Sequence, residues 1–306
     1  MESHATDRLR ADLMDPAHLA ALGRLEVISR WVSDGVLTGL HRSPRKGFSV
    51  EFAEHRPYQD GDDLRFMDWK VAARTDRWLI KQYEEETNLR ATIVLDVSRS
   101  MAWRSGPSLL TKLAYAEHLT GALALLLLRQ RDAVGLIRFD DAVRTVLKPA
   151  SRSLQWKRIL AGLMEQGSGA GSDAAGALRQ AVKLIKRRGM VILISDLLCD
   201  AEEVDETLRV LRAQHHDVTV LHLLDPAEQD LSLSVGESLF EDPESGATMV
   251  ATPSEVREAY AVTVAEAIDE WRARCAAIGA FYEPVPTNAP FGVPVRRAFA
   301  KRQRAP

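Results

Sequence analysis

The sequence predicts an α/β protein with a doubly wound, mostly parallel sheet flanked by helices, preceded by an N-terminal β-rich appendage. Three observations predict this fold class. From residue 91 onward, short apolar runs alternate with long helical stretches, a pattern typical of βαβ units. The short runs are almost wholly apolar, as parallel strands are when helices cover both of their faces. The length of 306 residues exceeds that of one common domain and leaves room for the appendage.

Six strands and five helices account for the alternation. The second and third strands pair beside each other, because Asp140-Asp141 supplies a turn between them. The helices occupy the intervals between the other strands. The expected strands are 91–96, 133–139, 143–147, 190–195, 218–224 and 281–285, and the expected helices are 109–129, 154–165, 173–187, 202–214 and 255–278.

The domain boundaries follow changes in residue composition and hydrophobic pattern along the chain. Residues 1–18 are expected to be a flexible N-terminus, 19–88 an N-terminal helix with the β-rich appendage, and 89–286 the main domain. Within the main domain, 231–253 is expected to form a hairpin insertion, because Pro and Gly punctuate its centre. Residues 287–306 are expected to be a mobile basic tail, since no acid accompanies the lysine and arginines after residue 295.

The composition limits the classes of partner. The 40 Lys and Arg residues against 43 Asp and Glu leave a formal net charge of −3, so no overall field recruits nucleic acid or an anionic membrane. Cys199 and Cys275 lie far apart with no C-x-x-C, so neither a disulfide framework nor a zinc knuckle is expected. Nucleic acid is therefore an unfavoured partner.

Targeting signals are not expected in this sequence. The first fifteen residues mix basic and acidic side chains and contain no apolar core of a signal peptide. The most apolar run, 122–128, is far shorter than the roughly 18 residues that a membrane span requires. The sequence therefore predicts a cytoplasmic protein without a membrane span.

Oxygen-bearing side chains gather at the predicted carboxyl edge of the sheet. Asp96 ends the first strand and is followed by Ser98 and Ser100, Asp196 follows the strand 190–195, and Ser172 follows a glycine-rich loop. Open α/β sheets bind ligands at this edge. Carboxylates with neutral oxygens suit a hard divalent cation, Mg²⁺ first and Mn²⁺ or Ca²⁺ otherwise. Two acids placed close together would repel each other without such a cation.

Each of these positions also has an ordinary structural explanation. Asp and Ser are common turn residues at strand ends, and Ser172 or Asp173 is a natural N-cap for the following helix. Taken together, the D-x-S-x-S spacing, the hydroxyl before a helix and the strand-terminal Asp favour a metal site over five separate turns.

These five residues resemble the metal-ion-dependent adhesion site of von Willebrand factor A domains, and the alternation from 91 to 285 resembles that fold. The resemblance implies that Asp96, Ser98 and Ser100 hold the cation with Ser172, directly or through water, and that Asp196 acts mainly through water. It also implies an open coordination position that takes a carboxylate from a protein partner. The chain departs from the common pattern at Ser172, where those domains usually carry Thr.

The appendage carries a more specific likeness. Its motifs resemble the bacterial family numbered fifty-eight among the domains of unknown function, and the likeness covers about residues 22–304. Members of that family typically accompany MoxR-type AAA+ ATPases, which implies an adaptor or co-chaperone-like partner of such an ATPase. The motifs are His41-Arg42-Ser43, Gly47, Glu51-Phe52, Arg56-Pro57-Tyr58, Gly61-Asp62-Asp63, Arg65, Asp68-Trp69-Lys70, Ala73-Arg74-Thr75 and Lys81.

From the residues alone, the charges of the appendage indicate a network of partly buried ion pairs in preference to a partner surface. The acids of 59–63 do not have the spacing of a calcium-binding EF loop. They are expected to form a turn.

The motifs of several enzyme classes are missing. Ser98 stands where a haloacid-dehalogenase-type phosphatase needs its second Asp, and there is no phosphate-binding G-x-x-x-x-G-K-[ST] and no G-x-S-x-G. His215-His216 and His222 are expected to be ordinary surface and core histidines. The sequence therefore favours a non-enzymatic, cation-dependent binding module. A metal-dependent hydrolase and an RNA-binding protein that uses the basic tail remain as alternatives.

Overall fold

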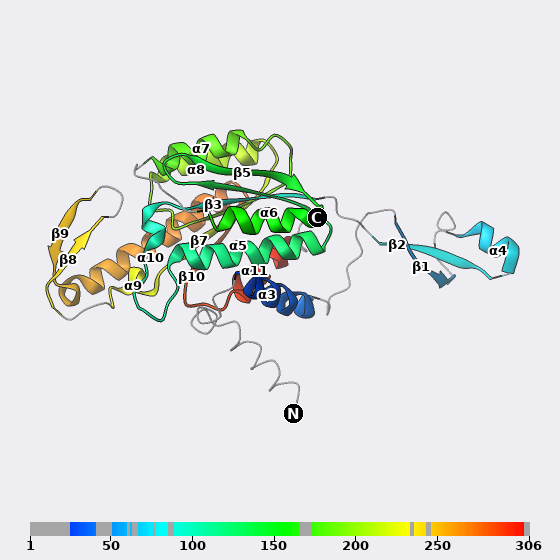
Figure 1. Cartoon of the computed structure of the whole chain (residues 1–306), viewed down its shortest axis with the longest axis horizontal. Coiled ribbons are helices and arrows are strands. Elements are labelled where there is room, and N and C mark those ends of the chain that lie inside the picture. Colours follow the sequence, from blue (N-terminus) through cyan, green and yellow to red (C-terminus); the bar gives the residue numbers. More distant parts are fainter. Residues whose placement is uncertain are drawn as a thin grey trace, which may run out of the picture. The chain divides into compact units, whose positions relative to one another are not determined.

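The computed structural model describes residues 25–40, 51–59, 62, 67–75, 77–84, 89–165, 173–232, 236–242 and 246–302. The chain divides into two compact units. The larger unit comprises residues 1–40 and 89–306, and the smaller unit comprises residues 41–88. Figure 1 labels the elements of both units.

The larger unit is built on a six-stranded sheet with the order β10-β7-β6-β3-β4-β5. All neighbouring strands are parallel except β4 and β5, which form an antiparallel pair at one edge. This arrangement confirms the predicted doubly wound, mostly parallel sheet. The strands are β3 (Arg90–Asp96), β4 (Ala133–Phe139), β5 (Val143–Ala150), β6 (Met190–Ser195), β7 (Asp217–Leu224) and β10 (Phe281–Pro286).

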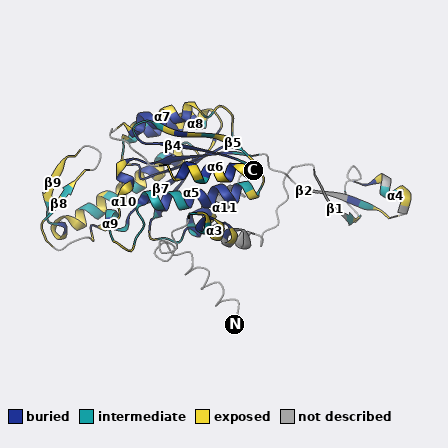
Figure 2. Cartoon of the chain, viewed as in Figure 1, coloured by how far each residue is buried: buried dark blue, intermediate teal, exposed yellow. Residues whose placement is uncertain are grey.

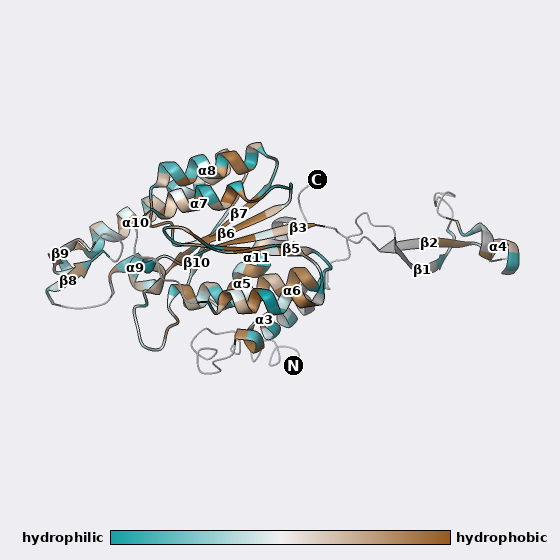
Figure 3. Ribbon diagram, turned by 45° about the horizontal axis from the view of Figure 1, so that its top comes forward, coloured by the Kyte–Doolittle hydropathy of each residue, from teal (hydrophilic) through white to brown (hydrophobic). Residues whose placement is uncertain are grey.

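Helices cover both faces of this sheet, as Figure 3 shows. One apolar cluster joins the sheet to α3 (Leu25–Leu40), α5 (Lys112–Arg129), α6 (Ser153–Leu163) and α11 (Gly292–Arg302). A second cluster on the opposite face joins it to α7 (Ala174–Lys183), α8 (Ala201–Ala213) and α10 (Pro253–Ala277). The inner strands β3, β4, β6 and β7 are buried along almost their whole length (Figure 2). Burial on both faces explains why their sequences are continuous apolar runs.

Helix α5 is the central helix of the first cluster. Thr111 caps its amino end, because the Thr111 hydroxyl accepts a hydrogen bond from the Ala114 amide at 3.0 Å. Its apolar run 122–127 is buried throughout. Gly121 lets α3 approach closely, since a Cβ at this position would lie 2.2 Å from the Ser29 hydroxyl oxygen. The missing side chain thus permits the packing of α3 on α5.

Two segments differ from the expected boundaries. Helix α3 belongs to the larger unit, where it packs on α5 and α11, instead of grouping with the appendage. The segment expected to be a mobile tail contains α11. Phe291, directly before this helix, and Val295 and Ala298 within it are buried against the first cluster. These three residues repeat at helical spacing, but the run of arginines hid that pattern.

The insertion and the appendage each contain a hairpin. The predicted insertion forms β8 (Ser238–Glu241) and β9 (Thr248–Ala251), preceded by the short helix α9 (Pro226–Asp230), which was not expected. In the smaller unit, β1 (Glu51–Pro57) pairs antiparallel with β2 (Leu79–Glu84), and α4 (Trp69–Thr75) lies between them in sequence.

The smaller unit contains one of the ion pairs expected there. Arg56 pairs with Asp62 at 2.7 Å between Nη2 and Oδ1, and the other Asp62 oxygen accepts from the Gln59 amide at 2.8 Å. The second contact makes the turn that the sequence indicated. The motif residues His41 to Gly47, Gly61, Asp63 and Arg65 lie outside the described residues.

No helix in the part of the chain that the structure describes is long and apolar enough to cross a membrane.

Candidate functional site

The predicted ligands of β3 and β6 come to one edge of the sheet. The two strands pair in parallel with Leu95 opposite Ile194, so their carboxyl ends lie side by side. Asp96 ends β3, Ser195 ends β6 and Asp196 follows it. We call this edge the acidic rim, defined by Asp96, Ser98, Ser100, Ser195, Asp196, Lys112, Asp225 and Glu228.

Asp96 is the centre of a hydrogen-bonded oxygen cluster. One of its carboxylate oxygens accepts from the Ser98 amide at 2.9 Å, and the other accepts from the Ser195 hydroxyl at 2.6 Å. The Ser98 and Ser100 hydroxyl oxygens lie 3.1 Å apart. All four side chains are buried, and only 2% of Asp96 is exposed. The cluster therefore holds three hydroxyls around one carboxylate, including Ser195, which sequence reasoning missed.

A short helix brings the serines of this loop together. The 3-10 helix η2 (Arg99–Ala102) follows β3 at once, and its turn places Ser100 beside Ser98. Trp103 closes the turn, because its amide donates to the Ser100 carbonyl at 3.2 Å. The Trp103 carbonyl in turn accepts from the Lys112 amide at 3.0 Å. We call residues 97–103 the serine loop. The start of α5 is hydrogen-bonded to the end of this loop.

The acidic rim disfavours the ionised form of Asp96. Burial raises the pKa of Asp96, and repulsion from the Asp196 carboxylate raises it further, to about 7. The hydrogen bonds from Ser195 and Ser98 lower this pKa and only partly oppose the shift. A positive charge close to Asp96 would relieve this cost.

Lys112 supplies one positive charge at the acidic rim. Its side chain is fully buried, and its ammonium nitrogen lies 2.7 Å from Asp196 Oδ2 and 2.5 Å from Glu228 Oε1. Burial opposes the charged form of Lys112, but attraction to Asp196 and Glu228 outweighs burial, so the pKa of Lys112 is raised. Sequence reasoning missed this residue. Its only signal in the sequence is that it is the single lysine of a largely apolar helix.

Helix α9 holds Glu228 in place for Lys112. Asp225 caps this helix by accepting from the Ala227 amide at 2.9 Å, and Glu228 Oε2 accepts from the Asp225 amide at 3.0 Å. The other Asp225 oxygen accepts from the Ser105 amide at 2.9 Å, which anchors the loop between η2 and α5. Hydrogen bonds within α9, to the loop before α5 and to Lys112 of α5 thus hold Asp225 and Glu228 in position.

His222 supports Asp196 from the next strand. Its Nε2 lies 2.9 Å from the Asp196 carbonyl oxygen, which can only accept, so this nitrogen carries the proton. Its Nδ1 then accepts from the Tyr282 hydroxyl at 2.6 Å. Burial lowers the pKa of His222 to about 4, which keeps the ring neutral. His222 is therefore a core histidine, as the sequence indicated.

The structure gathers Asp96, Ser98 and Ser100, and it places Asp196 on the neighbouring strand with its carboxylate on Lys112. Ser172 lies outside the described residues. Asp173 caps α7 through a 2.9 Å bond from the Gly176 amide, which is the structural role that the sequence allowed for it.

The chemistry of the donors fits a hard cation. Asp96 offers a carboxylate, and Ser98 and Ser100 offer hydroxyl oxygens, with no sulfur or imidazole among them. Within the described residues, no group of three His, Cys, Asp or Glu side chains is placed to hold a metal ion. A cation here would depend on the serine hydroxyls and on water for its remaining positions.

The comparisons with known proteins concern most of the chain. Residues 54–270 match the family described as "Protein of unknown function DUF58". The chain is 32% identical over 247 residues to the uncharacterized protein Rv1480 of Mycobacterium tuberculosis and to the uncharacterized protein Mb1516 of Mycobacterium bovis. Each alignment covers 79% of this chain and 76% of the relative.

Solved structures of low sequence identity align with about 70% of the chain. The conserved hypothetical protein BatB from Bacteroides thetaiotaomicron has a TM-score of 0.45 at 17% identity and covers 71% of this chain and 100% of its own. An aerotolerance-related membrane protein from Bacteroides fragilis has a TM-score of 0.45 at 18% identity and covers 70% and 99%. The VWA domain of SpRpn10 has a TM-score of 0.37 at 11% identity and covers 68% and 94%. From the match over residues 54–270 and the mycobacterial relatives, the chain belongs to the DUF58 family.

Proposed function

We propose that the protein is a non-enzymatic cytoplasmic adaptor that binds a protein partner through a divalent cation at the acidic rim. Asp96, Ser98 and Ser100 would hold the cation, with Ser172 as a further hydroxyl ligand and Asp196 acting through water. Mg²⁺ is the favoured ion, and Mn²⁺ or Ca²⁺ would suit the same oxygens. When bound, the cation supplies an open coordination position for an acidic side chain of the partner.

The buried oxygen cluster around Asp96 is the observation that carries this proposal. At the carboxyl edge of the sheet, where α/β folds bind ligands, the Asp96 carboxylate accepts from the Ser98 amide, and the Ser98 and Ser100 hydroxyl oxygens lie 3.1 Å apart. Ordinary turn chemistry accounts for the Ser98 amide bond to Asp96. It gives no reason to bury two further hydroxyls beside the same carboxylate.

Lys112 gives Asp196 a separate role in this proposal. Because the Asp196 carboxylate pairs directly with the ammonium group that it shares with Glu228, Asp96 is the carboxylate left to bind the cation directly. A single carboxylate with two or three hydroxyls leaves the cation with net positive charge. That remaining charge favours an acidic group on the partner over a neutral one.

Calorimetric titration of Mg²⁺ tests the cation. We expect saturable binding to the wild-type chain, and an affinity lower by roughly tenfold or more in Asp96→Asn, since one charged ligand is worth more than 1.4 kcal/mol. Asp140→Asn is the matched control, because Asp140 is a buried carboxylate that follows the neighbouring strand β4 and pairs with Arg144. Equal binding by wild type and Asp96→Asn would refute the cation.

The partner proposed by the family resemblance is a MoxR-type AAA+ ATPase. Pull-down of the purified ATPase on immobilised wild-type chain is expected to succeed in Mg²⁺ and to fail in EDTA. Asp96→Asn is expected to fail in both buffers, and Asp140→Asn to behave as wild type. Retention of the ATPase in EDTA would show that the partner binds without the cation.

A further inference from the structure

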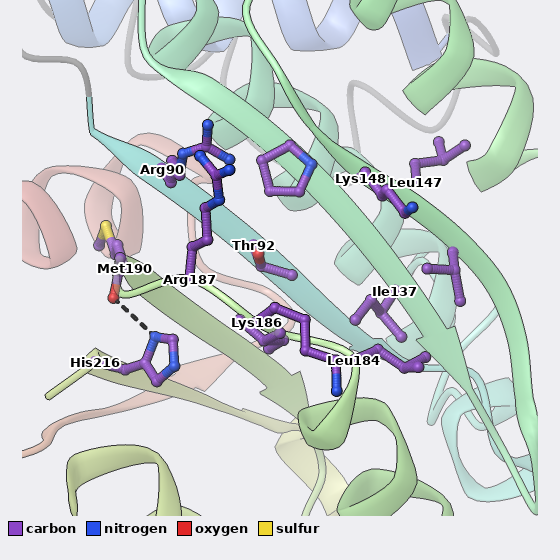
Figure 4. A pocket seen from close by; sticks show the side chains of 14 residues that line it. Arg90, Thr92, Ile137, Leu147, Lys148, Leu184, Lys186, Arg187, Met190 and His216 are labelled. Carbon is purple, nitrogen blue, oxygen red and sulfur yellow. Dashed lines mark hydrogen bonds between the residues drawn. The ribbon is translucent and has the colours of Figure 1, made fainter. Parts of the chain in front are cut away.

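A cavity of about 400 Å³ lies at the opposite end of the sheet, beside the amino ends of β3, β6 and β7. Thr92, Ile137 and Val146 line it from the strands, and Leu184 and Ile185 line it from the connection between α7 and β6 (Figure 4). Its volume falls in the range of roughly 300–1,000 Å³ that is usual for small-molecule sites. The residues of the acidic rim take no part in it.

The shortness of α7 explains why this space stays open. Helix α7 has 10 residues and packs on β4 and β5. It spans only about 15 Å, so it ends before it covers the amino end of this face. Val146 and Leu184 consequently remain 44% and 46% exposed. Within the described residues of the larger unit, no helix covers these apolar walls.

Basic side chains surround the apolar walls. Arg90, Lys148, Lys186 and Arg187 line the cavity from three different segments, and its lining contains no Asp or Glu. In the close-up, the guanidinium groups of Arg90 and Arg187 reach the same end of the cavity (Figure 4). Among the residues that the structure describes, no carboxylate pairs with any of these four cations. Lys148, Lys186 and Arg187 are exposed to solvent, and together with Arg90 they give the cavity a positive charge that attracts an anion.

The histidine of the lining has a structural role. His216 Nδ1 lies 3.3 Å from the Gly189 carbonyl oxygen, and the side chain is only 2% exposed. Burial lowers the pKa of His216, so the ring is neutral at physiological pH. The positive charge of the cavity therefore comes from the lysines and arginines alone.

We infer that this cavity binds a phosphate monoester with an apolar or aromatic body, such as a nucleoside monophosphate. Arg90 and Arg187 present forked donors suited to the phosphate oxygens, and Lys148 and Lys186 add point charges. Ile137, Val146 and Leu184 contact the body of the ligand. A free inorganic anion would use only the basic groups, so the apolar walls favour the ester.

Calorimetry with AMP, adenosine and inorganic phosphate tests the inference. The titrations are made in EDTA, so that no divalent cation at the acidic rim can recruit the phosphate. We expect saturable binding of AMP, with adenosine and inorganic phosphate each weaker by roughly tenfold or more, because each lacks one half of the recognised ligand. Phenyl phosphate is expected to bind in the same cavity and to compete with AMP.

Matched variants locate the binding. The double variant Arg90→Gln with Arg187→Gln is expected to weaken AMP binding by roughly tenfold or more. The control double variant Lys183→Gln with Arg188→Gln removes the same charge from exposed positions that do not line the cavity, and it is expected to bind as wild type. Val146→Trp fills the space without changing charge, so it should weaken AMP binding and spare inorganic phosphate.

Several results would overturn the inference. The first is that neither AMP nor phenyl phosphate shows saturable binding up to millimolar concentration. The second is that AMP and inorganic phosphate bind with equal affinity. The third is that the two double variants lose AMP affinity equally. The last result would mean that phosphate is attracted by general surface charge. None of these outcomes bears on the cation at the acidic rim, because the cavity lies at the other end of the strands.

Discussion

At Asp96, two effects act in the same direction: burial and repulsion from Asp196 both penalise the ionised carboxylate. At Lys112, the same neighbourhood acts in the opposite way, because Asp196 and Glu228 stabilise the ammonium group. Of the carboxylates of the acidic rim, Asp196 and Glu228 share the ammonium group of Lys112, whereas Asp96 is held by hydrogen bonds from Ser98 and Ser195. This difference between Asp196 and Asp96 leads to the first two predictions.

Asp96→Asn is expected to raise the free energy of unfolding in EDTA at pH 8 by roughly 2–4 kcal/mol, because it removes a buried charge. The folded-state pKa of about 7 lies above the ordinary value of 3.8, so wild type regains this stability as pH falls from above 7 toward 4. The gap between variant and wild type should therefore close in that window. Urea unfolding across pH measures it, and a gap independent of pH would contradict the shift.

Lys112→Met is expected to lower the free energy of unfolding by roughly 3–5 kcal/mol, since it leaves Asp196 and Glu228 without their shared cation. Adding Glu228→Gln should recover part of the loss by removing one of those charges. Urea midpoints of the single and double variants measure both effects. Lys183→Met, at an exposed position of α7, is the control and should be nearly neutral. A double variant no more stable than Lys112→Met would refute the shared ion pair.

At the scale of the element, the sequence predicts the strands and helices whose apolar residues follow a regular pattern. Continuous apolar runs gave the strands of the sheet, because strands buried on both faces have no polar side. The ends of α5 and α7 were less accurate: the structure begins α5 at Lys112 and ends α7 at Lys183, inside the expected 109–129 and 173–187. Residues 184–187 instead form the wall of the basic cavity, whose shape depends on where α7 stops.

Gly121→Ala tests the packing of α3 on α5. The added methyl group would meet the Ser29 hydroxyl at 2.2 Å, so we expect a loss of roughly 1–3 kcal/mol in the free energy of unfolding. Ser29→Ala removes the obstructing oxygen, and the Ser29→Ala, Gly121→Ala double variant should regain most of the loss. Thermal melting of the four chains gives the coupling energy. Additive effects of the two substitutions would show that the residues do not meet.

At the scale of the whole molecule, contacts between residues far apart in sequence complete the acidic rim and the packing of α11, and the sequence alone does not predict these contacts. The D-x-S-x-S spacing identified Asp96, Ser98 and Ser100 because they are local. Lys112 and Glu228 reach the acidic rim through separate elements that only the fold brings together, so no spacing could reveal them. Ser195 precedes the predicted Asp196, but its hydrogen bond to Asp96 depends on the pairing of β3 with β6. For the same reason, the sequence of the arginine-rich end predicts a tail and not a packed helix. Its apolar residues have a partner only once α3 and β10 are in place.

Truncation of residues 291–306 is expected to destabilise the larger unit by several kcal/mol, since Phe291 and Val295 are fully buried. Arg296→Gln leaves those contacts intact and should change the free energy of unfolding by less than about 0.5 kcal/mol. Urea unfolding of the two variants distinguishes a packed helix from a tail. A truncated chain as stable as wild type would refute the packing of α11.

The serine loop ends in a tryptophan, and this has a practical consequence. Trp103 is 43% exposed and is bonded through its backbone to both Ser100 and Lys112. A ligand docking at the acidic rim would change the solvent around this indole. Intrinsic fluorescence, compared between the native chain and Trp103→Phe, therefore provides an optical reporter of occupancy that needs no label.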